Sequence, residues 1–286
     1  MIVFHNRSAN QTMHGPRRLE LACLASAIVF AGTCFAAEPV VREIPRTDGR
    51  VAIKCTVYAP APIPKDKAGL VIHLYGSGGS HRTNEYNVGR PPYEKFRQLL
   101  AQRGYWLVVP DQGPRHWMND EACLQIDTVI NHMIMHDDVD RNRVQLLGAS
   151  MGAGSSLIYV MRRPEVIQSV AAIFPMTDFK QWLLERPGYR QPVEQAHSIK
   201  PANRDAALAM LSPLNHIEAF RGIPVFLLHG DRDTTVLPHH SRDFAAALKK
   251  QGCAVTYREA KGETHRDQIA QPYQQELADF LTQTKR

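Results

Sequence analysis

The sequence is poor in cysteine. It holds five cysteines among 286 residues, and only Cys55, Cys123 and Cys253 lie beyond residue 37. Three cysteines allow at most one disulfide bond, which excludes a small scaffold held together by disulfides. None of the three has the spacing to a pair of histidines that a zinc site requires. We therefore predict no bound metal, and the chemistry that the motifs below indicate needs no cofactor.

The chain also lacks a strong excess of either charge. Its formal net charge is +6, and the lysines and arginines are spread along the sequence rather than gathered in one segment. Proteins that bind nucleic acid usually concentrate positive charge on one face, so this pattern predicts no nucleic-acid partner. We find no internal repeat and no low-complexity segment, which excludes repeat architectures.

Long hydrophobic runs are absent except near the N-terminus. Residues 21–35 are hydrophobic, follow Arg17 and Arg18, and lead into Ala36 and Ala37. A charged region, a hydrophobic region and a small-residue exit are typical of a secretory signal peptide. The run is shorter than the ~20 residues of a membrane-spanning helix. We expect cleavage after Ala36 or Ala37, a secreted or periplasmic protein, and no membrane span after processing; a retained anchor is the alternative.

Residues 38–286 have the length of a single domain. Short β-branched runs alternate here with helical patterns, which predicts an α/β fold whose mostly parallel central sheet carries helices on both faces. We predict strands at 51–58, 70–74, 105–109, 143–147, 170–174, 225–228 and 255–259. The segment 177–220 is longer than a crossover needs. We expect it to be a small cap insertion over the carboxyl edge of the sheet; an ordinary pair of surface helices is the alternative.

The most informative motif is Gly148-Ala149-Ser150-Met151-Gly152, a G-x-S-x-G pattern. A hydrophobic strand is predicted before it, at 143–147, and a helix after it, at 153–162. A sharp turn between a strand and a helix exposes the serine as a nucleophile, and small flanking residues allow the strand and helix to approach closely. The alternative is a glycine-rich turn with an incidental serine.

A serine hydroxyl needs a base, and the base needs an orienting carboxylate. Two segments that follow predicted late strands supply them: 229–236, with Asp231 and Asp233, and 262–265, with His265. Both segments fall at carboxyl ends of strands, where ligands bind in open parallel sheets. Asp178, which follows the strand at 170–174, is an alternative acid.

These motifs resemble those of the α/β-hydrolase superfamily, and nearest its esterase, dienelactone-hydrolase-like and prolyl-oligopeptidase-like branch. The approach Asp140-Arg141-Asn142-Arg143-Val144 to the serine and the phrase His229-Gly230-x-x-Asp233-x-x-Val236 are both similar to that branch. The resemblance implies an α/β-hydrolase fold and a catalytic triad of Ser150, Asp233 and His265. His229 itself is expected to be a buried, hydrogen-bonded histidine.

The loop Tyr75-Gly76-Ser77-Gly78-Gly79 follows the predicted strand at 70–74 and matches the place of the superfamily's oxyanion loop, with tyrosine in place of the usual histidine. Backbone N–H groups without obstructing side chains stabilise a developing oxyanion. We expect the N–H of Met151 and that of Ser77 or Gly78 to supply them. Tyr75 and Trp117 are candidate substrate-binding residues, with packed core aromatics as the alternative.

The sequence thus predicts a secreted serine hydrolase that cleaves carboxylic esters, either small molecules or esters linked to a polymer, through an acyl-enzyme. One alternative is a serine peptidase of the prolyl-oligopeptidase-like type, although the residues ahead of the hydrolase core are too few for a propeller domain. Another is a catalytically inactive binding protein on the same scaffold. The sequence makes no prediction of the natural ester or of the oligomeric state.

Overall fold

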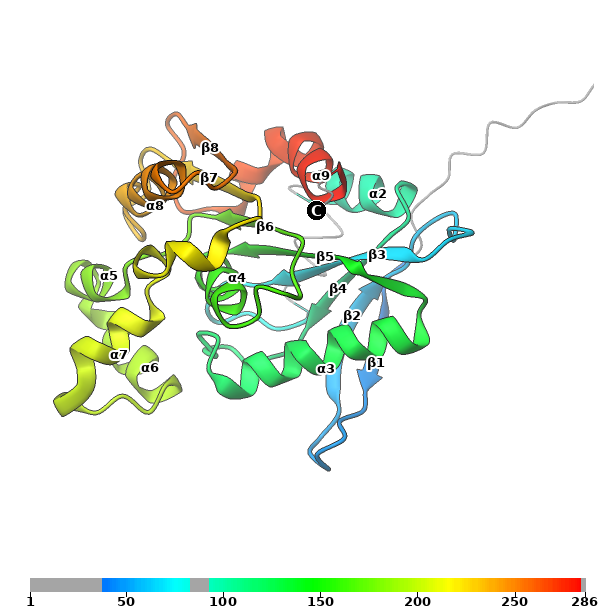
Figure 1. The fold of residues 1–286 in the computed structure, drawn as a ribbon, viewed down its shortest axis with the longest axis horizontal. Helices are drawn as coiled ribbons and strands as arrows, with labels where there is room; N and C mark the ends of the chain where they lie inside the picture. The colour runs from blue at the N-terminus through cyan, green and yellow to red at the C-terminus, as the bar shows by residue number, and fades with distance from the viewer. Residues whose placement is uncertain (1–37, 83–92, 284–286) are drawn as a thin grey trace, which may run out of the picture. The chain divides into compact units, whose positions relative to one another are not determined.

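The hydrophobic runs of the sequence form one eight-stranded sheet in the computed structural model, which describes residues 38–82 and 93–283 (Figure 1). The predicted signal peptide at 1–37 lies outside the described residues. The strands are β1 Val40–Ile44, β2 Ile53–Tyr58, β3 Ala68–Leu74, β4 Tyr105–Pro110, β5 Val139–Ala149, β6 Ser169–Ile173, β7 Val225–Gly230 and β8 Val255–Ala260.

The strand order is β1-β2-β4-β3-β5-β6-β7-β8. The pairs β1–β2 and β2–β4 are antiparallel, and every pair from β4 to β8 is parallel. The carboxyl ends of six parallel strands therefore meet along one edge. This is the architecture that the resemblance to the α/β-hydrolases implies. The prediction missed β1, an edge strand whose first two residues are exposed.

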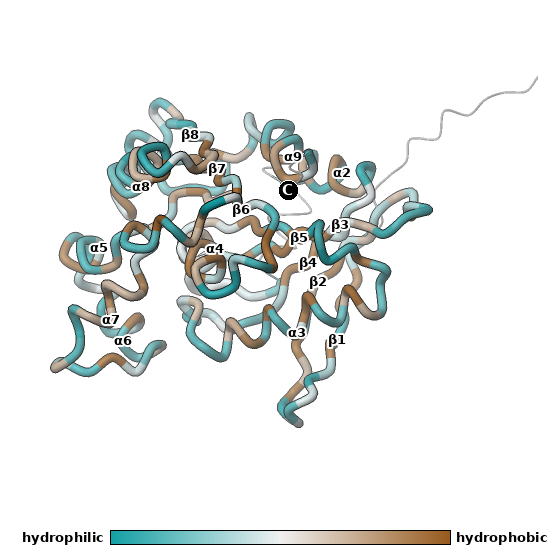
Figure 2. Tube along the Cα trace, viewed as in Figure 1, coloured by the Kyte–Doolittle hydropathy of each residue, from teal (hydrophilic) through white to brown (hydrophobic). Residues whose placement is uncertain are grey.

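Helices cover both faces of the sheet. On one face α2 (Glu94–Gln102) and α9 (Gln274–Gln283) pack side by side, and Phe96 and Leu277 belong to the hydrophobic cluster there (Figure 1). On the other face lie α3 (Asp120–His136), α4 (Met151–Arg162) and α8 (His239–Lys250). Figure 2 shows α4 as largely hydrophobic, and its residues 151–160 are all buried. A helix buried on all sides is held rigidly, which fixes the turn that precedes it.

The segment 177–220, which we call the cap insertion, contains three short α-helices between β6 and β7. They are α5 (Phe179–Glu185), α6 (Arg190–Ala196) and α7 (Arg204–Leu211). The ring of Trp182 in α5 packs on Trp117, which follows β4, with 5.4 Å between the ring centroids. The indole N–H of Trp182 also donates to the carbonyl oxygen of Thr235, which follows β7. The cap insertion is therefore attached to loops at the carboxyl edge of the sheet.

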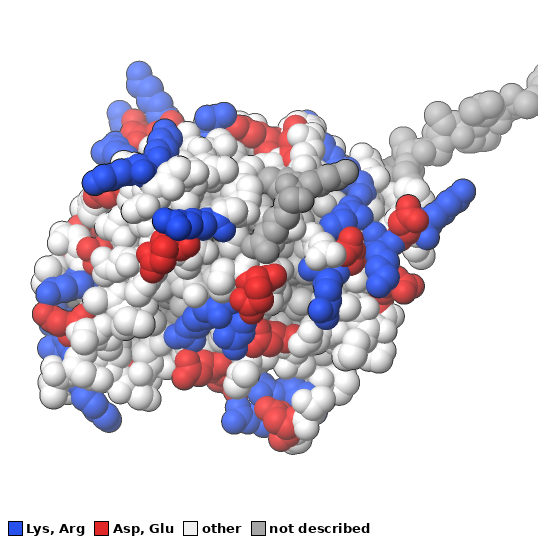
Figure 3. All heavy atoms as spheres, viewed as in Figure 1, with Lys and Arg blue, Asp and Glu red and all other residues white. Residues whose placement is uncertain are grey.

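Acidic and basic side chains are interspersed on the face shown in Figure 3. Among the described residues no helix is long and apolar enough to span a bilayer. Cys55, Cys123 and Cys253 are each buried and free, so no disulfide joins them.

Candidate active site

Ser150 stands in a strained turn between β5 and α4. Its backbone φ is 56° and its ψ is −121°, a region that non-glycine residues rarely occupy. The turn needs glycine on both sides because a Cβ atom on Gly152 would lie 2.0 Å from the Leu74 carbonyl oxygen. A Cβ on Gly148 would lie 2.2 Å from the carbonyl oxygen of Gly152. Close packing of strand on helix therefore forces the serine outward, as the motif predicts.

His265 links the serine to the acid. Its Nε2 lies 2.8 Å from Ser150 Oγ, and its Nδ1 lies 2.6 Å from Asp233 Oδ2. A carboxylate only accepts hydrogen bonds, so the neutral imidazole carries its proton on Nδ1 and leaves the Nε2 lone pair for the serine proton. The ring of Phe174 packs against the imidazole with 4.2 Å between centroids. The three residues predicted from separate motifs thus converge within hydrogen-bond reach.

The Asp233 side chain is wholly buried and surrounded by N–H donors. Its Oδ1 accepts from the backbone N–H of Thr235 at 2.8 Å and of Val236 at 3.0 Å. Its Oδ2 accepts a hydrogen bond from His265 Nδ1 and lies 3.4 Å from His229 Nε2. Burial by itself would raise the pKa of the Asp233 carboxyl, but the N–H groups of His229 and His265 outweigh it and hold this pKa below its usual range. Asp233 is therefore ionised at neutral pH.

His229 lies next to Asp233, a contact that the sequence analysis did not predict. The histidine is fully buried, as predicted. Its Nε2 lies 2.9 Å from the Val236 carbonyl oxygen, and its Nδ1 lies 2.7 Å from Ser241 Oγ. Because the carbonyl and the Asp233 carboxylate both accept, the ring proton is on Nε2, and the Ser241 hydroxyl donates to Nδ1. The spacing His229-Gly230-x-x-Asp233 at a strand end was the signal that could have identified this contact.

The oxyanion loop runs beside the serine, since a Cβ on Gly76 would lie 3.6 Å from Ser150 Cβ. The Gly78 N–H donates to the Pro114 carbonyl oxygen at 2.7 Å. That N–H is therefore already used, and the expectation that Gly78 could serve as an oxyanion donor is corrected. Of the two candidates in this loop, Ser77 remains. Met151 supplies the first N–H of α4, where the helix dipole favours negative charge.

The two candidate substrate-binding aromatics lie in the core. Tyr75 is 2% exposed, and its hydroxyl accepts from the Gln112 N–H at 2.8 Å and lies 3.3 Å from Asp111 Oδ1. Trp117 is 1% exposed and packs against Trp182. Neither ring presents surface to a ligand, so both are packed aromatics, the alternative that the sequence left open. Tyr75 instead holds the loop that follows β4.

The alternative acid is not placed for the role. Asp178 caps the N-terminus of α5, and its Oδ1 accepts from the Gln181 N–H at 3.0 Å. Asp231 accepts from the Gly262 N–H at 2.6 Å and ties the two loops together. Among the described hydrogen bonds, Asp233 is the one acidic residue that bonds His265.

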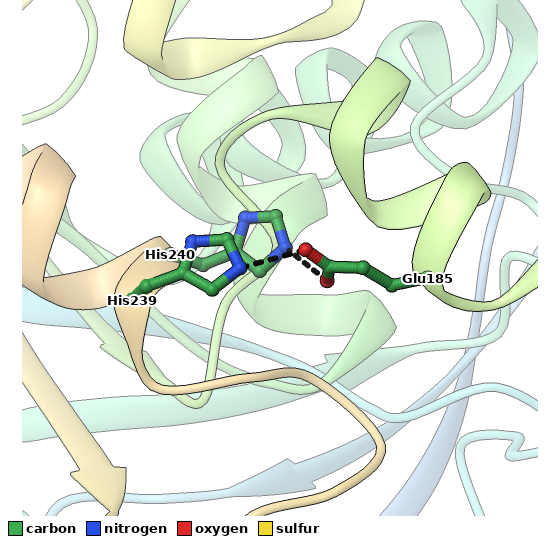
Figure 4. A group of neighbouring side chains, drawn as sticks. All are labelled: Glu185, His239 and His240. Carbon is green, nitrogen blue, oxygen red and sulfur yellow. Dashed lines mark hydrogen bonds and ion pairs between the residues drawn. The ribbon is translucent and has the colours of Figure 1, made fainter.

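One group among the described residues brings three possible metal ligands together: Glu185, His239 and His240 (Figure 4). The Glu185 carboxylate lies 2.7 Å from His239 Nε2 and 3.3 Å from His240 Nε2. The Nδ1 of His240 accepts from the backbone N–H groups of Thr177 and Asp178, so its own proton is on Nε2 and points at Glu185. The two imidazoles are also stacked, with 30° between their planes, and both direct Nε2 at the Glu185 carboxylate. This geometry fits hydrogen bonds to a shared carboxylate better than a metal ion.

Residues 94–285 match the prolyl oligopeptidase family. The chain belongs to this family. Its family and its fold place it in the α/β-hydrolase superfamily, which confirms the resemblance seen in the motifs. No curated protein sequence matches the chain.

Solved structures share the fold at low sequence identity. A puromycin-hydrolysing peptidase of Mycobacterium tuberculosis is 18% identical with a TM-score of 0.71, over 88% of this chain and 40% of that one. An S-formylglutathione hydrolase from Agrobacterium tumefaciens is 15% identical with a TM-score of 0.71, over 88% and 99%. The acylaminoacyl peptidase of Pyrococcus horikoshii is 14% identical with a TM-score of 0.67, over 87% and 42%. The chain thus spans about two fifths of the length of the peptidases that it resembles.

Proposed function

We propose that this prolyl oligopeptidase family member hydrolyses carboxylic esters through an acyl-enzyme. Ser150 Oγ attacks the ester carbonyl while His265 Nε2 takes its proton. Asp233 holds the imidazole in the required tautomer and stabilises its charged form. The N–H groups of Met151 and Ser77 stabilise the oxyanion, and His265 then protonates the leaving alcohol. Water activated by the same histidine releases the acid and restores the serine. The observation that carries this proposal is His265 bonded to Ser150 on one side and to Asp233 on the other.

Ester cleavage is the less demanding of the two reactions that such a triad serves. An alkoxide is a better leaving group than an amide nitrogen, so the acyl-enzyme forms from an ester without the precise leaving-group protonation that a peptide requires. Peptide hydrolysis is the second candidate, because the family match and several structural neighbours are peptidases. The substrate class, small ester or polymer-linked ester, is part of the proposal and has to be measured.

The test is active-site labelling followed by turnover. A fluorophosphonate probe should label the wild-type protein, and Ser150→Ala should abolish the label. p-Nitrophenyl esters from acetate to palmitate, run beside acetylated and feruloylated sugars, should be hydrolysed faster than proline p-nitroanilides. Equal labelling of wild type and Ser150→Ala would refute the nucleophile, and preferential cleavage of the anilides would favour the peptidase.

The proposed location is secreted or periplasmic, on the basis of the hydrophobic run 21–35 and the small residues Ala36 and Ala37. Expression of the chain with a C-terminal tag in a bacterium, followed by fractionation, should give a protein outside the cytoplasm. Its mass should correspond to a start at residue 37 or 38. A full-length tagged protein in the cytoplasm would contradict this proposal.

A further inference from the structure

In the described hydrogen bonds, the cap insertion contacts the turn that carries Asp233 through one peptide group. We propose that Trp182 and Arg186, both contributed by the cap insertion, are positioning residues for Asp233, acting through the peptide that joins Thr235 to Val236. The inference rests on the proposed function, because it assigns these residues to the same triad. Neither side chain touches the serine or the catalytic histidine in any described contact.

Both polar ends of this peptide are bonded. Its oxygen, the Thr235 carbonyl, accepts from Trp182 Nε1 at 3.2 Å and from Arg186 Nε at 3.2 Å. Its nitrogen, the N–H of Val236, donates to Asp233 Oδ1 at 3.0 Å. Donors at the oxygen polarise the amide and strengthen its N–H as a donor, all the more when one of them is a cation. The path from the cap insertion to the acid is therefore two hydrogen bonds long.

The same helix turn is anchored a second time. Trp182, Glu185 and Arg186 are three and four residues apart, so they share one face at the end of α5. Glu185 holds His239 and His240 at the start of α8, as Figure 4 shows. Residues at the end of α5 therefore form hydrogen bonds to both ends of the segment 235–240. A shift of α5 would move the Thr235 carbonyl and, with it, the donor to Asp233.

Because these groups are buried, the loss of one hydrogen bond is costly. Trp182 is 1% exposed and Asp233 is 2% exposed, so water does not replace a lost donor easily. The neighbouring residue Thr234 is exposed and offers the turn little packing. Asp233 and Val236 on either side of it are buried, so the conformation of the turn depends on these hydrogen bonds as well as on packing.

The test compares four variants by kcat for p-nitrophenyl acetate, normalised to active sites titrated with the fluorophosphonate probe. Trp182→Phe keeps an aromatic ring and removes the N–H donor. Arg186→Met keeps the stem and removes the guanidinium, while Arg186→Lys keeps the charge. Lys180→Met is the matched control, since Lys180 also lies on α5 but pairs with the exposed Asp205 inside the cap insertion.

We expect kcat to fall about tenfold in Trp182→Phe and in Arg186→Met, with KM nearly unchanged, as for the loss of one hydrogen bond that acts on the transition state. Arg186→Lys should recover part of the loss, and Lys180→Met should match the wild type. The far-downfield proton NMR signal of the His265–Asp233 hydrogen bond should shift or broaden in the first two variants only.

A merely structural role would lower the unfolding temperature and leave both the normalised kcat and the NMR signal unchanged, which would overturn the inference. Wild-type kcat in the Trp182→Phe/Arg186→Met double variant would do the same. An inert wild-type protein, neither labelled nor active on any ester, would instead refute the proposed function. In that case the NMR signal alone decides the inference, because it reports the His265–Asp233 contact without turnover.

Discussion

Replacing Asp233 with asparagine should inactivate the protein by reversing the tautomer of His265. The Asp233 carboxylate accepts at both oxygens: Oδ1 from the backbone N–H of Thr235 and Val236, and Oδ2 from His265 Nδ1. An asparagine has one oxygen and one NH2 group, so it satisfies only one of these two sides. Two backbone donors fix the oxygen at the Oδ1 position. The NH2 group then points at His265 Nδ1, which has to become the acceptor.

The reversed tautomer of the His265 ring should lower the rate of hydrolysis. With its proton moved to Nε2, the imidazole presents an N–H to Ser150 Oγ in place of a lone pair and no longer accepts the serine proton. In triads of this geometry the wrong tautomer lowers kcat by about 10⁴. That factor corresponds to about 5 kcal/mol of transition-state stabilisation. Loss of the carboxylate also leaves the His229 N–H with only the Val236 carbonyl as its partner.

The assay is steady-state hydrolysis of the best p-nitrophenyl ester by wild type and Asp233→Asn at neutral pH. Asp178→Asn is the matched control, because Asp178 caps α5 and does not contact His265. We expect the control to keep its kcat and Asp233→Asn to lose about four orders of magnitude while both remain folded by circular dichroism. A kcat of Asp233→Asn within tenfold of the wild type would refute the reasoning from the carboxylate to the tautomer.

Three further predictions concern the surroundings of the triad. Gly152→Ala should prevent soluble expression or abolish probe labelling, because its Cβ would lie 2.0 Å from the Leu74 carbonyl oxygen, whereas Gly188→Ala meets no atom within 4 Å and should behave as wild type. His229→Leu should lower kcat per titrated site about tenfold or more by removing a donor near Asp233, and His229→Gln should recover part of it. Burial lowers the pKa of His240 to about 4, below its value of ~6.5 in an unfolded chain. Between these two pH values the unfolded state binds more protons than the folded state. The free energy of unfolding should therefore fall as the pH drops from 6.5 to 4. Urea unfolding at pH 7 and pH 4.5 checks this, and an unchanged midpoint would contradict it.

The strained turn at Ser150 was predictable because its determinants are local. Gly148, Ser150 and Gly152 lie within five consecutive residues, and the hydrophobic strand and helix on either side are visible in the sequence. The meeting of Ser150, Asp233 and His265 was predictable for a different reason. All three follow strands of a parallel sheet, and the carboxyl ends of such strands share one edge. The alternation of strands and helices therefore placed these residues at one edge of the sheet, and the resemblance to the α/β-hydrolases selected Asp233 over Asp231.

The occupied donor in the oxyanion loop was beyond the reach of the sequence. Nothing in the loop 75–79 indicates that the Gly78 N–H would be bonded to the Pro114 carbonyl, which belongs to a loop after another strand. The same limit applies to Tyr75 and Trp117. An aromatic residue at a strand end fits a ligand pocket or a core equally well, and the burial that decides between them depends on neighbours such as Trp182 from the cap insertion.

The edge strand β1 was missed because its side chains do not carry the hydrophobic pattern of a buried strand. Only Ile44 is buried in Val40–Ile44, and pairing with β2 through the backbone is what defines the strand. Hydrogen-bonded pairing leaves no signature in a single sequence, whereas burial does. The interior strands, which are buried along most of their length, were all recognised.

The turn that carries Asp233 is held in one conformation by contacts with residues outside the turn. Two of the donors to Asp233 are backbone N–H groups, and backbone donors are aimed correctly only where the chain is held in one conformation. On its N-terminal side the turn is held by Asp231, which bonds the Gly262 N–H. On its C-terminal side the fixed point is the Thr235 carbonyl, which is bonded by α5 of the cap insertion. An insertion that looks peripheral in the sequence therefore supplies one of the restraints on the turn of the proposed catalytic acid, beside the contact of His229 with the Val236 carbonyl. Changes in it should alter kcat before they alter the fold.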